Sequence, residues 1–292
     1  MAFNLQTFKT RTLTAIVFAV VMLSGLLINH WTFFLLFTII HFGCWIEYQK
    51  LIGLIDEDYK QIDWFHKYSI MLIGFCFMMW MTNRAYKIGH AELQGIGWLT
   101  GLIIAILFLG KEIVFKKHLN IKLIGYSLLG LIYISLSWGL MIDLRNIGMI
   151  FKGQNFLFAD FGLQYPLTII ISIWINDTMA YIVGSFIGKT PLSKISPKKT
   201  WEGTVGGVIL SVATIAIILY FLDKKIDYEF LIIALIAAVA GTFGDLLESK
   251  IKRMANVKDS GNFMPGHGGF LDRFDSLLIA TPFVWLFIML FV

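Results

Sequence analysis

Nine long runs of apolar residues, almost free of charged side chains, constrain this chain more than any other feature. The runs lie at residues 13–28, 31–46, 68–82, 96–109, 123–142, 165–188, 205–222, 230–247 and 276–292. A helix needs roughly 20 apolar residues to cross a hydrocarbon core about 30 Å thick, and the runs are of that order. The chain is 58% apolar and 15% charged, and its mean hydropathy is +0.76, unlike a soluble domain.

The runs are continuous, which distinguishes them from the strands of a membrane barrel, whose residues alternate with a period of two. Helices and closed barrels are the structures that satisfy their backbone hydrogen bonds inside lipid. We therefore predict an all-α integral membrane protein, a bundle of about nine transmembrane helices. No internal repeat or long linker divides the sequence, so we predict a single polytopic membrane domain over residues 1–292.

Lysine and arginine are distributed unevenly among the segments that connect the runs. With the N-terminus in the cytoplasm, most of the 24 basic residues lie on the cytoplasmic side, as the positive-inside rule requires. We predict a multi-pass protein of the cell membrane with a cytoplasmic N-terminus. This topology and anionic headgroups explain the net charge of +5. Because no basic patch is interleaved with stacking aromatics, we expect the lipid bilayer, and no nucleic acid, as a partner.

Two acidic residues, Asp177 and Asp245, fall inside apolar runs. A carboxylate at membrane depth costs several kcal/mol unless it is paired or hydrated, so both are candidates for a functional site. The alternative is a structural polar contact between helices. Asp245, Glu248, Ser249 and Lys252 follow helical spacing, so a polar face is expected to run from membrane depth into the cytoplasm.

The cytoplasmic segment at residues 188–203, GKTPLSKISPKKTWEG, combines lysines with helix-start signals. Ser196 and Pro197 are predicted as the N-cap and first residue of a short helix. Lys198 and Lys199 would then lie in its first turn, where free N–H groups and ammonium charges favour an anion. The alternative is that these lysines reflect positive-inside topology alone.

Small residues recur just before this segment. Ala180, Gly184 and Gly188 are spaced by four, which predicts a stripe that allows another helix to approach closely. We interpret the stripe as a packing surface.

A second polar stretch at residues 257–276, VKDSGNFMPGHGGFLDRFDS, separates the last two apolar runs. Its glycines permit positive φ and close backbone approach just ahead of a helix expected near Asp272. The stretch supplies phosphate-binding cations and carboxylates suited to Mg²⁺, namely Lys258, Asp259, Asp272, Arg273 and Asp275. Asp275 is either a capping residue or a ligand. His267 is a candidate base, ligand or phosphate donor.

The ordered motif at residues 249–275, SKIKRMANVKDSGNFMPGHGGFLDRFD, closely resembles the signature of the phosphatidate cytidylyltransferases, also called CDP-diacylglycerol synthases. That signature runs Ser-x-apolar-Lys-Arg, four residues, Lys-Asp, a short spacer and His-Gly-Gly-x-x-Asp-Arg-x-Asp. Met264 stands where the family usually has leucine, isoleucine or phenylalanine. Upstream, DTMAYIVG and SPKKTWEG resemble a second family block. The motifs and cytoplasmic loops span residues 177–275, and the N-terminal half is similar only as a set of hydrophobic helices.

The resemblance implies transfer of a cytidylyl group from CTP to phosphatidic acid, which gives CDP-diacylglycerol and pyrophosphate. It implies Mg²⁺ and, for many members, a monovalent cation such as K⁺. By the same resemblance Asp245 and Asp272 bind the metal, with Asp177 as a third acidic contributor. A homodimer is a further expectation from the family, and the active site would face the cytoplasm.

Such a reaction needs relief of charge repulsion and in-line placement more than a strong base. The attacking phosphate monoester already carries about −1.5 to −2 charge near neutral pH. We therefore predict the catalytic residues as Asp245, Asp272, Lys258 and Arg273. The predicted substrate-binding residues are Lys198, Lys199, Lys252, Arg253, His267, Gly268 and Gly269, with Lys258 and Arg273 also contacting phosphate.

Two other functions compete with this prediction. Another CTP-dependent lipid enzyme, such as a polyprenol kinase, would transfer the γ-phosphoryl group and release CDP. An ion-coupled transporter would use Asp177 and Asp245 to carry ions through the bundle. The transporter leaves the lysine-rich and glycine-rich loops unexplained and predicts flux without nucleotide turnover.

Overall fold

The computed structural model describes residues 5–114, 120–151, 161–263 and 268–292. These residues are almost entirely helical, with one short antiparallel hairpin. The chain divides into two compact units. Unit 1 comprises Met1–Gly139 and Met254–Phe274, and unit 2 comprises Leu140–Arg253 and Asp275–Val292.

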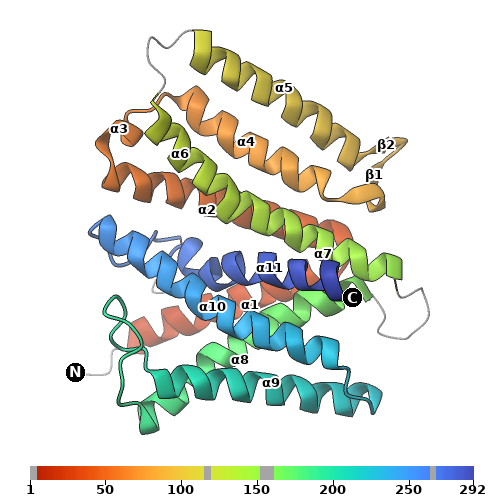
Figure 1. Cartoon of the computed structure of the whole chain (residues 1–292), viewed down its shortest axis with the longest axis vertical. Coiled ribbons are helices and arrows are strands. Elements are labelled where there is room, and N and C mark those ends of the chain that lie inside the picture. The colour runs from red at the N-terminus through yellow and green to blue at the C-terminus, as the bar shows by residue number, and fades with distance from the viewer. Residues whose placement is uncertain (1–4, 115–119, 152–160, 264–267) are drawn as a thin grey trace. The chain divides into compact units, whose positions relative to one another are not determined.

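Unit 1 is built mainly from the N-terminal half of the chain (Figure 1). Its elements are α1 (Leu5–Leu27), α2 (His30–Ile55), α3 (Glu57–Lys60), α4 (Trp64–Trp80), η1 (Asn83–Ala85), β1 (Lys87–Ile88), β2 (Ala91–Glu92), α5 (Leu93–Val114), α6 (Ile121–Gly130) and the π-helical η2 (Leu131–Leu136). Helix α7 (Ser137–Phe151) begins in unit 1 and continues in unit 2. The remaining elements are η3 (Phe161–Leu163), α8 (Gln164–Ile187), α9 (Trp201–Asp223), α10 (Tyr228–Met254) and α11 (Leu271–Phe291).

Each of the nine apolar runs coincides with helix, which confirms the all-α membrane fold. Among the described residues, seven helical segments are long and apolar enough to cross a membrane, and they are His30–Ile55, Leu93–Val114, Ile121–Ile147, Gln164–Ile187, Trp201–Leu222, Tyr228–Met254 and Leu271–Phe291. The two other runs lie in α1, whose apolar part Ile16–Leu27 is shorter, and in the 17-residue α4. Nine crossings and a single domain stay predictions.

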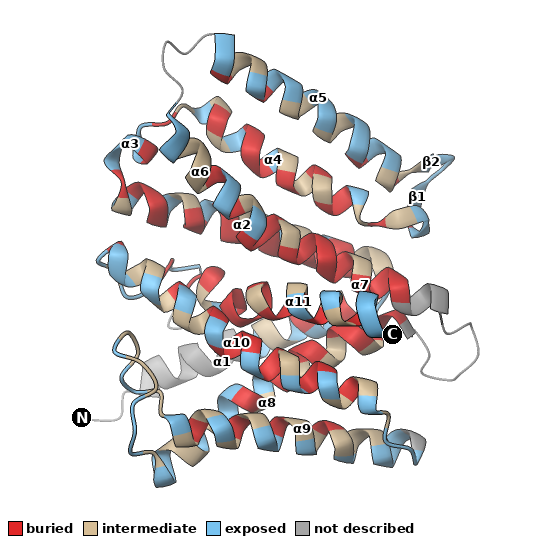
Figure 2. Cartoon of the chain, in the orientation of Figure 1, coloured by how far each residue is buried: buried red, intermediate tan, exposed pale blue. Residues whose placement is uncertain are grey.

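Helix α2 is largely buried in unit 1, whereas α5 is largely exposed (Figure 2). Ser135 of η2 accepts a hydrogen bond from Trp45 Nε1 at 2.9 Å, and its Oγ lies 3.0 Å from His41 Nε2. Gly130 lets α6 approach α2 closely, because a Cβ at this position would lie 2.6 Å from the Trp45 ring. The exposed apolar face of α5 is suited to contact lipid.

A buried polar cluster joins α4, α5 and α6 within unit 1. His66 Nδ1 lies 3.1 Å from Glu112 Oε1, and His66 Nε2 lies 2.9 Å from Ser127 Oγ. All three side chains are buried. Because buried polar groups are costly without partners, this cluster favours one register of the three helices.

In unit 2, α8 and α9 pack closely through small residues, as the spacing of Ala180 and Gly184 predicts. A Cβ on Gly203 would lie 2.6 Å from the carbonyl oxygen of Ala180, and one on Gly207 would lie 2.7 Å from that of Asn176. Ser211 of α9 also donates to the carbonyl oxygen of Ser172 at 2.8 Å. The stripe therefore serves packing within the chain.

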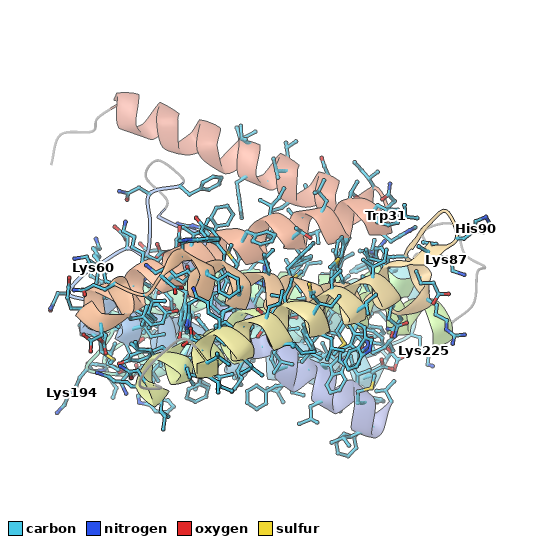
Figure 3. All side chains as sticks on the ribbon, turned by 90° about the horizontal axis from the view of Figure 1, so that it is seen from above. Trp31, Lys60, Lys87, His90, Lys194 and Lys225 are labelled. Carbon is cyan, nitrogen blue, oxygen red and sulfur yellow. The ribbon has the colours of Figure 1, made fainter. Side chains whose placement is uncertain are left out.

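The labelled lysines of each unit project from its ends (Figure 3). In unit 1, Lys60 lies at the opposite end from Lys87 and His90, and in unit 2, Lys194 lies at the opposite end from Lys225. Each unit therefore carries basic residues at both of its ends, and the assignment of these ends to the two sides of the membrane stays a prediction.

Candidate functional site

A cavity of about 490 Å³ lies in unit 2, where α8 and α10 meet the segment that leads into α9. Its lining residues include Asn176, Asp177, Tyr181, Lys198, Lys199 and Asp245. The two acids that the sequence places at membrane depth thus share one cavity with the two lysines of the 188–203 segment. The structure brings four predicted site residues together.

The charges in this cavity are paired across elements. Asp177 comes from α8 and is exposed to the cavity, whereas Asp245 comes from α10. The ammonium of Lys199 forms an ion pair with Asp245, and the two side chains are 27% and 30% exposed. Lys199 also interacts electrostatically with Asp177. Lys199 thus interacts with two carboxylates. Its single positive charge does not balance their two negative charges.

The loop before α9 differs from the prediction. Residues 196–199 form a turn, closed by a hydrogen bond from Lys199 N to Ser196 O at 3.1 Å, and no helix begins at Ser196. Helix α9 begins at Trp201, where Thr200 is the N-cap and accepts a hydrogen bond from Gly203 N at 3.1 Å. The prediction of a helix starting at Ser196 was therefore wrong, and the N-cap that is used lies four residues later.

Glu202, in the first turn of α9, closes the same loop from its other end. Its carboxylate accepts hydrogen bonds from the backbone N–H groups of Lys189 and Thr190, all at 3.2 Å. A further backbone bond joins Leu192 N to Lys199 O at 2.7 Å. These bonds hold the lysine-bearing loop as a compact hairpin at the mouth of the cavity.

Asp275 also belongs to unit 2. Its side chain is 9% exposed and interacts electrostatically with Asp245 and Asp177. It does not cap α11, because the helix begins upstream of it. A Cβ on Gly244 would lie 2.4 Å from the carbonyl oxygen of Asp275, so α10 and α11 approach closely beside the acids.

The predicted polar face of α10 is present in the structure. Ser249 Oγ donates to Asp245 Oδ1 at 3.3 Å, and Lys252 forms an ion pair of 2.5 Å with Glu248. Arg253 is exposed one residue further along. The helix continues to Met254, so this face runs without a break past the apolar part of α10.

In unit 1, residues of the glycine-rich stretch on either side of its undescribed part contact the carboxylate of Asp272. Asp272 Oδ2 accepts hydrogen bonds from Ser260 N at 2.9 Å and from Gly269 N at 2.8 Å. Gly268 has φ +83°, and a Cβ there would lie 2.6 Å from the same oxygen. Positive φ and close approach are thus found at Gly268, where the approaching group is the carboxylate of Asp272.

Glu47, a residue of α2 that the sequence pattern did not single out, contacts this stretch within unit 1. Glu47 is 7% exposed and accepts hydrogen bonds from Phe270 N and Leu271 N, both at 2.9 Å. The available signal was an acid placed directly after the apolar run at 31–46. Nothing in the sequence pattern linked it to a loop more than 200 residues away.

The remaining predicted residues lie in or beside the same stretch. Lys258 and Arg273 are both exposed in unit 1, as cations that bind a soluble anion should be. Gly269 is buried. His267 lies outside the described residues. The binding roles assigned to these residues stay predictions.

The residues of unit 2 suit a divalent cation by their chemistry. Asp177, Asp245 and Asp275 supply carboxylate oxygens, which Mg²⁺ prefers as ligands. Among the residues that the structure describes, no group of three or more His, Cys, Asp or Glu side chains is already arranged around a metal position. The donors fit Mg²⁺ by their chemistry, and Lys199 pairs with Asp245.

An acid-and-lysine cavity in a helical membrane protein has the charges that a membrane enzyme acting on phosphate groups needs. A sequence model of the cytidylyltransferase family matches residues 9–291, and the chain belongs to that family.

Several curated relatives carry the name phosphatidate cytidylyltransferase. The protein of Bacillus subtilis (strain 168) is 35% identical over 223 residues, which cover 75% of this chain and 78% of the relative. That of Staphylococcus saprophyticus is 30% identical over 281 residues, or 94% and 96% of the two chains. That of Staphylococcus haemolyticus is 45% identical over 123 residues, or 41% and 47%. The family makes the chain a CTP-dependent nucleotidyltransferase.

Proposed function

We propose that this protein transfers the cytidylyl group of CTP to phosphatidic acid and releases CDP-diacylglycerol and pyrophosphate, a step of phospholipid biosynthesis. The observation that carries the proposal is the cavity of unit 2, which Asp177, Asp245, Lys198 and Lys199 line together. Family membership and the names of the relatives support the same reaction.

The chemistry follows from the charges of the two substrates. An oxygen of the lipid phosphate attacks the α-phosphorus of CTP, a new P–O bond forms, and the bond to the β-phosphate oxygen breaks. The electron pair of that bond leaves with pyrophosphate. Since the attacking phosphate is already ionised near neutral pH, the protein has to hold two anions in line and neutralise them.

Lysines around the cavity supply this neutralisation. Lys199 is held at the wall by Asp245, and Lys198 is exposed beside it. We propose that both ammonium groups contact phosphates, and the hairpin that carries them is held by Glu202. We assign Lys258 and Arg273, from the stretch before α11, to phosphate binding as well.

Asp177, Asp245 and Asp272 are the residues that we propose to hold Mg²⁺. Such an ion, when bound, neutralises phosphate charge and polarises the phosphorus that is attacked. Asp177 and Asp245 line the cavity of unit 2, and Asp272 is included from the family resemblance. A monovalent ion such as K⁺ is a further proposed cofactor.

We place the reaction at the cytoplasmic face of the cell membrane. The polar face of α10 runs from Asp245 to Lys252, past the end of the apolar segment, so a lipid headgroup and a water-soluble nucleotide can both reach it.

A homodimer is also proposed, from the family resemblance. Cross-linking of the protein in native membranes tests the dimer.

The direct test is an assay of the purified protein in mild detergent. Pyrophosphate release from CTP is measured with Mg²⁺, with and without phosphatidic acid. Release that requires the lipid, with CDP-diacylglycerol as product, is the expected result. Formation of CDP with a phosphorylated lipid would instead identify a kinase, and ion flux without nucleotide turnover would identify a transporter.

A further inference from the structure

Glu47 lies in the apolar helix α2, yet its carboxylate contacts residues of the polar stretch at 257–276. Its Oε1 accepts from Phe270 N and its Oε2 from Leu271 N, each at 2.9 Å, and Oε2 also lies 2.6 Å from Ser260 Oγ. The side chain is 7% exposed. A buried carboxylate is costly unless hydrogen-bonded, so these contacts couple the position of the loop to α2.

Helix α2 contacts this loop at two adjacent turns, through Gly43 and Glu47. A Cβ on Gly43 would lie 2.4 Å from the ring of Phe270, so the missing side chain leaves room for that ring. Glu47 follows one helical turn later, on the same face. A Cβ on Gly261 or Gly269 would lie 2.2 Å from Glu47 Oε1, so both glycines let the backbone close directly over the carboxylate.

Ser260 connects Glu47 to Asp272. Its Oγ lies 2.6 Å from Glu47 Oε2 and 2.9 Å from Asp272 Oδ2, and its backbone N–H also donates to Asp272 Oδ2 at 2.9 Å. Two carboxylates from different helices therefore hold one serine and the backbone of residues 269–271. All of these residues belong to unit 1.

We propose that Glu47 is a positioning residue, which holds residues 260–261 and 269–271 and thereby fixes the carboxylate of Asp272 in the orientation that the active site uses. The inference rests on the proposed function for the role of Asp272. Glu47 itself contacts the loop and not the reacting groups. Glutamine keeps only one acceptor oxygen in place of two, so one of the two backbone N–H donors loses its partner and the loop loosens.

The test compares Glu47→Gln with two matched variants. Glu57→Gln makes the same change at an exposed residue of α3, and Glu112→Gln makes it at a buried residue that contacts His66. Hydrogen–deuterium exchange is followed in a peptide covering residues 268–274. The expected result is faster exchange there in Glu47→Gln and wild-type exchange there in both matched variants.

Activity provides the second readout. The Mg²⁺ concentration for half-maximal activity is expected to rise about 10–100-fold in Glu47→Gln, the range seen when residues that orient metal ligands are lost. It should stay at the wild-type value in Glu57→Gln. Ser260→Ala removes only the hydroxyl that links Glu47 to Asp272, so it should shift exchange and the Mg²⁺ requirement in the same direction. This variant replaces Glu47→Gln in the test if Glu47→Gln does not fold.

Unchanged exchange at residues 268–274 in both Glu47→Gln and Ser260→Ala would overturn the positioning role. So would an equal rise in exchange throughout α4 and α5, because that result would mean general loosening of unit 1. Exchange needs no substrate, so a wild-type protein without cytidylyltransferase activity would overturn the proposed function and not the contact between Glu47 and the loop.

Discussion

Lys199 and Asp245 form an ion pair at the wall of the cavity in unit 2. The pair joins the loop before α9 to α10, and both side chains remain partly exposed. Both residues line the cavity, so each partner of the pair is also accessible to a ligand that enters it. Phosphate oxygens compete for the ammonium, and cations compete for the carboxylate.

Asp245→Asn should abolish most of the activity while leaving the fold intact. Asparagine keeps the shape of the side chain but loses the charge that balances Lys199 and attracts a divalent ion. We expect kcat to fall at least about 100-fold, as when one electrostatic group of an active site is removed. Steady-state assays across Mg²⁺ concentrations measure the effect.

The matched variant for this experiment is Asp58→Asn, in the exposed helix α3. It should keep wild-type kinetics. Wild-type kcat in Asp245→Asn would rule out the metal-binding and catalytic role of Asp245.

Lys199→Gln should weaken the use of CTP more than it weakens the fold. Glutamine cannot neutralise a phosphate, so kcat/KM for CTP is expected to fall about 10–100-fold, which corresponds to about 1.4–2.7 kcal/mol of transition-state stabilisation. Lys194→Gln is the matched variant, because Lys194 lies exposed in the same loop and is not among the cavity residues. Equal effects of the two substitutions would show that only the total charge of the loop matters.

Gly207→Ala should destabilise unit 2 through the contact between α8 and α9. The new Cβ would lie 2.7 Å from the backbone oxygen of Asn176, a distance that requires one helix to shift. We expect a loss of about 1–3 kcal/mol in the free energy of unfolding, the usual cost of overpacking. Thermal unfolding in detergent measures it.

Gly110→Ala is the comparison for this glycine, because nothing lies within 4 Å of a Cβ at that position of α5. Alanine favours helix over glycine by about 1 kcal/mol, so this variant should be as stable as wild type or more so. If Gly207→Ala is equally tolerated, the close packing of α8 on α9 is not required for stability.

The sequence predicts much of the fold because membrane helices need long apolar runs. All nine runs are helical, and the spacing of Ala180 and Gly184 correctly predicts close packing. The start of α9 was missed because Ser196 and Pro197 imitate a helix start, whereas Thr200 caps the real one. Local signals of this kind do not reveal which of two competing caps is used.

The candidate site was predicted in part. Asp177, Asp245, Lys198 and Lys199 stand out because charge is rare in apolar surroundings, and the structure gathers them around one cavity. Glu47 was missed because its partners lie more than 200 residues away, and periodicity within a helix carries no information about such contacts.

The stability of unit 1 should depend on pH through Asp56, which follows α2 and lies outside the membrane-spanning helices. Its Oδ2 lies 2.6 Å from the ammonium of Lys122, and this hydrogen bond, chiefly, lowers the pKa of Asp56 below its ordinary value of 3.8. A carboxyl group with a lowered pKa stabilises the folded state above its unfolded pKa. That stabilisation disappears as the pH falls through the folded pKa.

Asp56→Asn should therefore lower the thermal midpoint near neutral pH, and the difference from wild type should shrink once the pH falls below about 4. Asparagine can still cap α3, where Asp56 now accepts from Asp58 N at 3.0 Å, so the variant removes mainly the charge. Lys122→Gln should reproduce the same pH dependence, because it removes the other half of the pair. A difference that stays constant from pH 7 to pH 3 would mean that the ion pair does not contribute and that packing around Asp56 does.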